Sequence, residues 1–383
     1  MLIKDIEGYS LDDHAYKNDA YSCMNNSDKK QFFIDCFKES TSNNVLYVHI
    51  PYCLSKCKYC IYQSEKLSSK ELLEQHIREL IPCQIEQYQE IFDSVSFDQV
   101  YFGGGTPTIV CPDLMDLLFR NIPNFKDIPK KCIETSPSTI DLGHVKLFSS
   151  YNFSFVSIGV QTLSERICKK WNRPYISNIE LLRIAECMHQ HDLYFNFDLI
   201  CFLDKKDIRD LLEFRQHLEF IVKECRPSSI TIHQLVQSQY SDERTRALIK
   251  TLRNILKEHP SYVCANSLLN DKDASMDTLY NSEYRLVLDG TFFTHYMWGK
   301  NSRLPVEGYN ILSLGYTKKF QTTSNVDNLL YIPSNSILRD IEYDKYISTD
   351  SRNIQKTLAA EAAIGHPCET ELSNLKLHAR VIK

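Results

Sequence analysis

The sequence contains no run of about 18 apolar residues, the length that a membrane-spanning helix requires. It also lacks the dense Lys and Arg clusters that mark proteins binding nucleic acids or other polyanions. The first residues, MLIKDIEGYSLDDHAYKND, do not have the basic and then apolar layout of a signal peptide. We therefore expect a cytoplasmic protein whose partners include neither a membrane nor a nucleic acid.

The composition that is present is that of an ordinary globular protein, with 43% hydrophobic residues, 24% charged residues and a formal net charge of −5. At 383 residues the chain is long enough to bury a core, so its stability requires neither a metal nor disulfides. Its 14 cysteines therefore need a separate explanation. Most are scattered singly, several within apolar runs, where a reduced thiol acts as a small hydrophobe.

Three cysteines, Cys53, Cys57 and Cys60, are clustered in the stretch VLYVHIPYCLSKCKYCIYQSE, directly after an apolar run that is typical of a strand. A reducing compartment does not favour disulfides, so the cluster indicates a metal or redox site. Zinc normally takes four ligands, and no nearby CxxC or HxxxH pair supplies a second half of such a site. Three thiolates suit a [4Fe-4S] cluster that keeps one iron open to an exogenous ligand.

The spacing CxxxCxxC, with Tyr59 before the last cysteine, resembles the cluster motif of the radical S-adenosylmethionine (SAM) superfamily. The alternative is a chance spacing. The resemblance implies that Cys53, Cys57 and Cys60 bind a [4Fe-4S] cluster, whose open iron is chelated by the amino and carboxylate groups of SAM. An electron from the reduced cluster then cleaves SAM to a 5′-deoxyadenosyl radical, while the protein orients the reactants and excludes water.

Strand-like and helix-like segments alternate along the next part of the chain, which predicts an α/β fold with parallel strands and right-handed crossovers. The six expected strands are Val45 to Ile50, Gln99 to Phe102, Lys131 to Thr135, Phe155 to Val160, Phe195 to Cys201 and Ser229 to Leu235. Six such units indicate a partial (βα)6 barrel, whose chemistry takes place at the carboxyl ends of the strands. The cysteine stretch follows the first of them.

Polar and glycine residues stand at or just beyond the ends of the later strands. In GGGTPT, which starts at Gly103, the glycines let the backbone approach a ligand closely, the alternative being a flexible turn. Glu134 ends the third expected strand and is either a SAM ligand or a helix cap. Gln161 and Asp198 end apolar strands, which favours ligand contacts, whereas Arg173 on a helical stretch has a solvated surface position as its alternative.

The succession HIPYCLSKCKYC, YFGGGTPT, SIGVQTL and NFDLI resembles the oxygen-independent coproporphyrinogen III oxidase family, over roughly residues 45–235. That family includes the HemN dehydrogenase, the HemW haem chaperones and the class C radical SAM methyltransferases. The resemblance implies that Tyr47 packs beside the cluster, and it places Tyr59 among the cofactor-binding residues. It further implies SAM contacts for Gly104, Gly105, Thr106, Glu134, Gln161, Arg173 and Asp198.

The sequence also departs from the family pattern. Tyr62 stands where the dehydrogenases have a further cysteine, and Phe202 and Asp204 replace a Gly-Leu-Pro turn. Of a later glycine-rich turn that ends in histidine in the haem chaperones, only Gly315 is present. We therefore expect a protein that does not oxidise coproporphyrinogen III, because Asp204 repels a tetracarboxylate and Phe202 narrows its passage.

The chain changes character near Ser241, where SDERTRALIKTLRNILKEH predicts a charged amphipathic helix. We expect an N-terminal extension over residues 1–44, a radical SAM partial barrel over 45–240 and a smaller C-terminal α+β region over 241–383. Paired strands are predicted in TLYNSEYRLVLDGTFFTHYMWGKN and a terminal helix in SRNIQKTLAAEAAIG.

Three functions of different classes remain open at this point. The first is a radical SAM enzyme that modifies a small molecule or a peptide, with C-methylation as one outcome. The second is a porphyrin enzyme of the dehydrogenase type, and the third is a haem chaperone with little turnover. The resemblance also implies an electron donor such as flavodoxin or ferredoxin, and it leaves open whether a second SAM binds.

Overall fold

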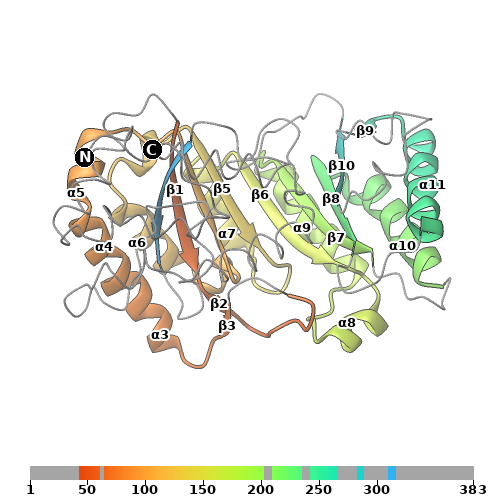
Figure 1. Cartoon of the computed structure of the whole chain (residues 1–383), viewed down its shortest axis with the longest axis horizontal. Helices are drawn as coiled ribbons and strands as arrows, with labels where there is room; N and C mark the ends of the chain where they lie inside the picture. Colours follow the sequence, from red (N-terminus) through yellow and green to blue (C-terminus); the bar gives the residue numbers. More distant parts are fainter. Residues whose placement is uncertain are drawn as a thin grey trace, which may run out of the picture.

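The computed structural model describes residues 43–60, 64–201, 209–234, 242–264, 283–288 and 309–315. Their main feature is a nine-stranded sheet in the order β11-β1-β4-β5-β6-β7-β8-β10-β9 (Figure 1). The strands of this sheet are β1 (Asn43–Ile50), β4 (Gln99–Gly104), β5 (Lys130–Thr135), β6 (Phe155–Gln161), β7 (Phe195–Cys201), β8 (Ser229–Gln234), β9 (Tyr262–Cys264), β10 (Glu283–Leu288) and β11 (Tyr309–Leu314). A separate two-stranded sheet joins β2 (Tyr52–Cys53) to β3 (Glu65–Lys66).

From β11 across to β8 every neighbouring pair of strands is parallel. The connections are helical, as parallel pairing requires. The α-helices are α3 (Lys70–Gln75), α4 (Ile81–Gln87), α5 (Gln89–Ser94), α6 (Pro112–Asn121), α7 (Leu142–Ser150), α8 (Glu165–Trp171), α9 (Asn178–Gln190), α10 (Arg209–Phe220) and α11 (Asp242–Glu258). Short π-helical turns follow α3 and α10. All six strands expected from the sequence form, which confirms the α/β class of the prediction.

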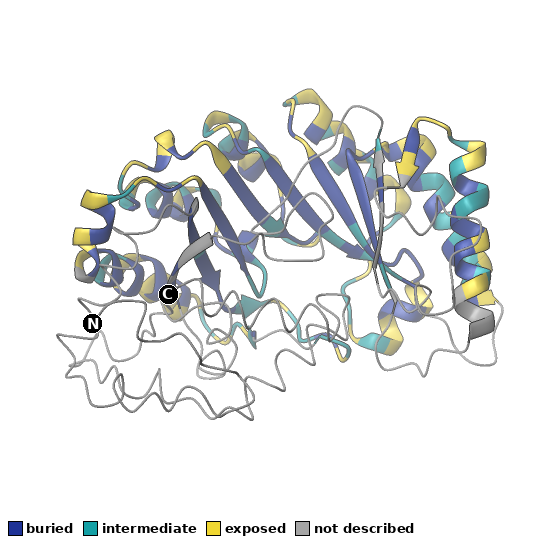
Figure 2. Cartoon of the chain, turned by 45° about the horizontal axis from the view of Figure 1, so that its top comes forward, coloured by how far each residue is buried: buried dark blue, intermediate teal, exposed yellow. Residues whose placement is uncertain are grey.

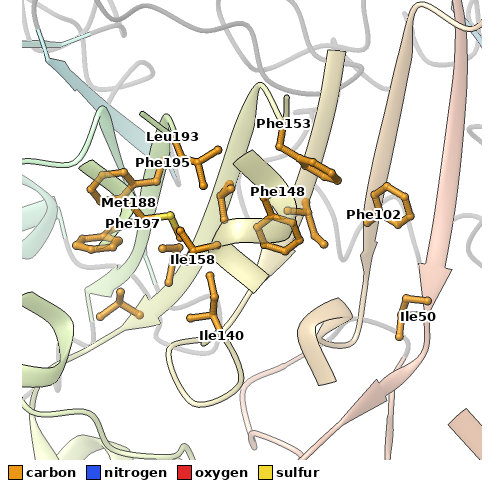
Figure 3. Close-up of a cluster of buried hydrophobic side chains, with 14 of the residues drawn as sticks. Ile50, Phe102, Ile140, Phe148, Phe153, Ile158, Met188, Leu193, Phe195 and Phe197 are labelled. Carbon is orange, nitrogen blue, oxygen red and sulfur yellow. The ribbon is translucent and has the colours of Figure 1, made fainter. Parts of the chain in front are cut away.

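The two faces of the sheet differ because side chains alternate along each strand. In β6, Val156, Ile158 and Val160 point into the apolar core, whereas Ser157 and Gly159 point to the opposite face. Figure 3 shows this core, in which side chains of the strands meet those of α7 and α9. Figure 2 shows the consequence for burial, since the strands are almost wholly buried while the helices keep exposed outer sides. The polar face is therefore the face of the sheet on which polar side chains could contact a ligand.

Local capping fixes the helices near the cysteine stretch. Ser164 accepts a hydrogen bond from the backbone N–H of Ile167 at the start of α8, and Ser177 forms a capping box with Glu180 at the start of α9. Asn172 ends α8 in the left-handed region, with φ of 57°. This tight ending turns the chain back toward the sheet immediately before Arg173.

The described strands of the C-terminal part join the same sheet at both of its ends. β11 pairs in parallel with β1, and β10 pairs antiparallel with both β8 and β9. The expected strand in EYRLVL is thus present as β10. The expected terminal helix and the second half of the predicted strand pair lie outside the described residues, and the boundary near Ser241 stays a prediction.

Candidate functional site

The cysteine stretch is attached to the carboxyl ends of β1 and β4. After β1 the chain enters β2. The segment that follows β4 forms backbone hydrogen bonds to the end of β1 and to β2. Gly105 N–H donates to the carbonyl of Ile50 at 2.8 Å, and Thr106 N–H donates to the carbonyl of Tyr52 at 2.9 Å. These bonds hold GGGT against the segment that carries Cys53.

Glycine is required at two positions of this junction by the closeness of the neighbouring backbone. A Cβ on Gly105 would lie 2.6 Å from the carbonyl oxygen of Tyr52, and one on Gly104 would lie 2.9 Å from that of Ile50. Gly104 also has φ of 112°, which L side chains rarely adopt. The glycines therefore serve the packing of two chain segments, and a contact between their backbone and SAM stays a prediction.

Cys53, Cys57 and Cys60 are free thiols, with Cys57 buried and the other two half-buried. Two of them have a donor beside the sulfur. The Thr106 hydroxyl lies 3.4 Å from Cys53 Sγ, and Arg173 Nη1 lies 3.9 Å from Cys57 Sγ. Donors at ligand sulfurs are a standard means of stabilising thiolates and tuning a cluster. The donor set thus fits an iron–sulfur cluster.

The C-terminal end of α8 holds the cysteine loop from outside the sheet. Lys58 N–H donates to the carbonyl of Trp171 at 3.0 Å, and Asn172 Nδ2 donates to the carbonyl of Lys56 at 3.0 Å. The rings of Tyr59 and Trp171 meet edge to face, with centroids 6.0 Å apart. Figure 1 shows the loop running from β2 toward α8. Tyr59, which the resemblance placed at the cofactor, therefore also packs the loop onto α8.

Arg173 reaches from the end of α8 into the site. Besides approaching Cys57, it donates to the carbonyl of Gly159 and, at 3.3 Å, to the hydroxyl of Ser136. Burial lowers the pKa of Arg173, but the neighbouring Tyr59 and Cys57 outweigh that effect and raise the pKa above its ordinary value. Its guanidinium is consequently a fixed positive charge beside the thiols, and the alternative of a solvated surface arginine is wrong.

Gln161 has the features of a ligand-binding residue. It ends β6 at a β-bulge and has φ of 67°, in a region that costs a non-glycine residue free energy. Its Nε2 and the guanidinium of Arg173 lie on the same side of Gly159. Its Oε1 is buried and has no hydrogen-bond partner among the described residues. A buried acceptor without a partner beside a fixed cation fits a polar ligand such as SAM.

Glu134 lies on the polar face and is tied to the neighbouring strand. Its carboxylate accepts a hydrogen bond from the Tyr101 hydroxyl at 2.5 Å and another from the backbone of Gly104. Burial raises the pKa of Glu134 to about 7, with the nearby Asp198 adding to the rise. Tyr47 stacks on Tyr101 with ring centroids 5.9 Å apart. These contacts show Glu134 holding the turn after β4, and its expected contact with SAM stays a prediction.

Asp198 on β7 is fixed by a hydrogen-bond network on the same face. It accepts from the Ser157 hydroxyl at 2.6 Å and from Asn196 Nδ2 at 2.7 Å. Asn196 is fully buried, and its Oδ1 accepts in turn from Ser229 at 2.8 Å and Thr231 at 3.0 Å. The network holds the Asp198 carboxylate on the polar face. Asp198 is the fourth of the seven residues of β7, so the expectation that it ends the strand is wrong.

Sequence reasoning missed the residues that support this site. Tyr101, Ser157 and Asn196 belong to apolar-looking strands, and only their alternation with larger apolar residues marks them as members of the polar face. No sequence pattern marked Trp171 and Asn172 as residues that hold the cysteine loop, because that role depends on where α8 ends. Three further residues on which the sequence analysis relied, Tyr62, Phe202 and Asp204, lie outside the described residues.

Comparison with protein families gives a match of residues 47–218 to the Radical SAM superfamily. The matched segment begins in β1 and ends in α10, so it contains the three cysteines, Glu134, Gln161, Arg173 and Asp198. Within the described residues no helix combines the length and the apolarity needed to cross a bilayer.

Several curated proteins are similar to this chain over part of their length. A haem chaperone HemW of Buchnera aphidicola subsp. Acyrthosiphon pisum (strain APS) is 29% identical over 194 residues, which cover 50% of this chain and 50% of that protein. An oxygen-independent coproporphyrinogen-III oxidase-like protein HemZ of Bacillus subtilis (strain 168) is 27% identical over 198 residues, or 50% of this chain and 38% of that protein. The similarity thus spans half or less of these relatives.

Among solved structures, that of coproporphyrinogen III oxidase (HemN) from Escherichia coli matches with a TM-score of 0.58 at 15% identity. The match covers 74% of this chain and 66% of that chain. It shows a shared fold, and therefore confirms that the parallel sheet with its helices is the expected partial barrel.

Proposed function

We propose that residues 47–218, which match the Radical SAM superfamily and resemble HemW and HemN, form the domain of an enzyme that cleaves SAM reductively. That superfamily uses a [4Fe-4S] cluster and SAM. Cys53, Cys57 and Cys60 bind the cluster in this proposal. The observation that carries it is the contact of Arg173 with the Cys57 thiol, beside Gln161, whose buried amide oxygen has no partner among the described residues.

The cluster, when bound, supplies the single electron that splits SAM into methionine and a 5′-deoxyadenosyl radical. The chain's residues bind and orient the reactants. Thr106 and Arg173 donate to the ligand sulfurs, and Gln161 Oε1 accepts a hydrogen bond from SAM. Asp198, held rigid by Ser157 and Asn196, offers a charged acceptor to the same ligand. Fixed groups of this kind hold SAM in one reactive geometry.

The substrate in this proposal is a small molecule or a peptide, and its modification by C-methylation is the favoured reaction. Support comes from the sequence departures at Tyr62, Phe202 and Asp204, which disfavour a tetracarboxylate porphyrinogen. Flavodoxin or ferredoxin serves as the electron donor.

A second candidate is a haem chaperone role, favoured by the 29% identity to HemW over half of each chain. The presence of only Gly315 from the glycine-rich, histidine-ending turn argues against it. Reconstituting the protein anaerobically with iron and sulfide and then measuring its products separates the candidates. Formation of 5′-deoxyadenosine or S-adenosylhomocysteine supports an enzyme, whereas tight haem binding without cleavage of SAM supports a chaperone.

A further inference from the structure

Three exposed lysines lie in the cysteine loop or in the segments that adjoin it. Lys58 directly follows Cys57, and Lys66 is the register partner of Cys53 in the β2–β3 pair. Lys169 lies in the last turn of α8, which bonds to the loop through the contact between Lys58 N–H and the Trp171 carbonyl. All three side chains are exposed, and none forms an ion pair with another described residue.

The positive charge of these lysines contrasts with the rest of the protein, since the whole chain carries a net charge of −5. Between positions 51 and 67 the sequence has three lysines and a single acid, Glu65, which is half-buried. On α8 the exposed Lys169 and Lys170 outnumber one exposed acid, Glu165. The neighbouring Arg166 is not part of the feature, since Asp210 and Glu213 neutralise it. A small positive area on an acidic protein attracts an acidic partner to one place and repels it elsewhere.

An apolar contact surface accompanies the charges. Leu54, the residue after Cys53, is 47% exposed although it is large and apolar. Trp171 is half-buried next to the loop, and Lys170 Nζ lies 5.8 Å from the centre of its ring. Apolar side chains within a charged rim are the usual composition of an interface between two proteins.

The proposed reaction requires an electron from outside the chain, because each reductive cleavage of SAM consumes one electron and the cluster must be reduced again before the next. We infer that Lys58, Lys66, Lys169 and Leu54, together the basic face, form the docking site for an acidic one-electron carrier protein. The inference rests on the proposed function. On this face the reduced carrier gives up one electron, the bound cluster takes it up, and no covalent bond forms or breaks.

The test reverses two charges of the basic face, in K66E/K169E. The matched control is K130E/K146E, because Lys130 at the start of β5 and Lys146 on α7 are also exposed but lie away from the cysteine loop. Flavodoxin serves as the probe. Its affinity for the reconstituted proteins is measured without turnover, from the anisotropy of its flavin fluorescence. The rate of SAM cleavage is then measured with reduced flavodoxin and, separately, with dithionite, a small reductant that needs no docking.

We expect K66E/K169E to bind flavodoxin about tenfold more weakly and to show a similar rise in the KM for flavodoxin. Its iron content and its rate with dithionite should equal those of the parent, and the control should stay within about twofold of it. Equal losses in both variants, or no loss in either, overturn the inference. Loss of iron from K66E/K169E also overturns it, because the lysines then serve the cluster.

The same experiment separates this inference from the proposed function. If the parent protein does not cleave SAM even with dithionite, the proposed function fails. In that case the binding measurement still decides the docking site, since it needs no turnover.

Discussion

Asp198 owes its position to Asn196, a fully buried residue whose amide bonds with four neighbouring polar side chains. Replacing Asn196 with Ala leaves several buried hydroxyls and one oxygen of Asp198 without this partner. We expect a loss of about 1–3 kcal/mol in the free energy of unfolding, measured by urea denaturation. Asn178→Ala, at an exposed position of α9, is the control and should change stability by less than about 0.5 kcal/mol.

The Asp198 carboxylate itself is expected to act on SAM. Asp198→Ala removes a charged hydrogen-bond acceptor and should weaken SAM binding by about 1.5–3 kcal/mol, with the iron content unchanged. Isothermal titration calorimetry of the reconstituted protein gives the affinity, and a chelator assay gives the iron. If iron is lost while the affinity for SAM stays the same, Asp198 supports the fold and does not bind SAM.

Glu134 should make stability depend on pH. Its pKa is raised to about 7 in the folded protein, so the folded state holds the proton more tightly than the unfolded state does. Stability from this group is present below the unfolded pKa of about 4.5 and is lost as pH rises toward 7. We therefore expect the apo protein to lose unfolding free energy between pH 5 and about 8. Glu134→Gln should lack this part of the decrease, and identical pH profiles would contradict the raised pKa.

At this scale the sequence allowed part of the site to be predicted. Cys57, Gln161 and Asp198 were identifiable, since each belongs to a motif or ends an apolar strand. Asn196 was not, because alternation along β7 indicates the face on which a residue lies but not the partners that the adjacent strands bring to it.

At the scale of elements, the junction between β4 and β2 positions the cysteine loop, and it tolerates no side chain at Gly105. A Cβ there lies within 2.9 Å of three backbone atoms of Tyr52, which cannot move aside as a side chain does. Gly105→Ala should lower the free energy of unfolding by more than about 1 kcal/mol and reduce iron binding.

Gly159→Ala offers a matched comparison for Gly105→Ala. Its nearest obstacle is the end of a flexible side chain, Gln161 Nε2 at 3.0 Å. We expect the iron content and the thermal midpoint to stay near the parental values while SAM affinity falls, because the Gln161 amide is displaced. If both variants lose iron equally, the distinction between backbone and side-chain obstruction is wrong.

The strands of the βα units were predictable because each is a short apolar run followed by a helical pattern. The pairing of β11 with β1 was not, since Tyr309 and Asn43 are far apart in the chain and no periodicity links them. The ends of the helices could not be predicted from the sequence either. For example, α8 ends where it does because Asn172 adopts a left-handed conformation. For that reason the contact of α8 with the cysteine loop appears only in the structure.

At the scale of the whole molecule, the site brings together residues from three strands of the parallel sheet, from the segment after β1 and from the end of α8. Cys53 comes from the segment after β1, Glu134 from β5, Gln161 from β6 and Asp198 from β7, with Arg173 following α8. Glu134 and Gln161 lie at the carboxyl ends of their strands, as a (βα) arrangement predicts, whereas Asp198 lies in the middle of β7. In the proposed function, the chemistry that these residues support depends on a cluster held by Cys53, Cys57 and Cys60.

The most direct test is therefore the formation of 5′-deoxyadenosine by Cys57→Ala. The parent protein, Cys57→Ala and a control, Cys111→Ala, are reconstituted anaerobically with iron and sulfide and then incubated with SAM and dithionite. Cys111 is exposed at the start of α6 and has no place in the site. Liquid chromatography with mass spectrometry should detect 5′-deoxyadenosine from the parent and from Cys111→Ala and none from Cys57→Ala. Formation at the parental rate by Cys57→Ala would contradict the radical SAM account.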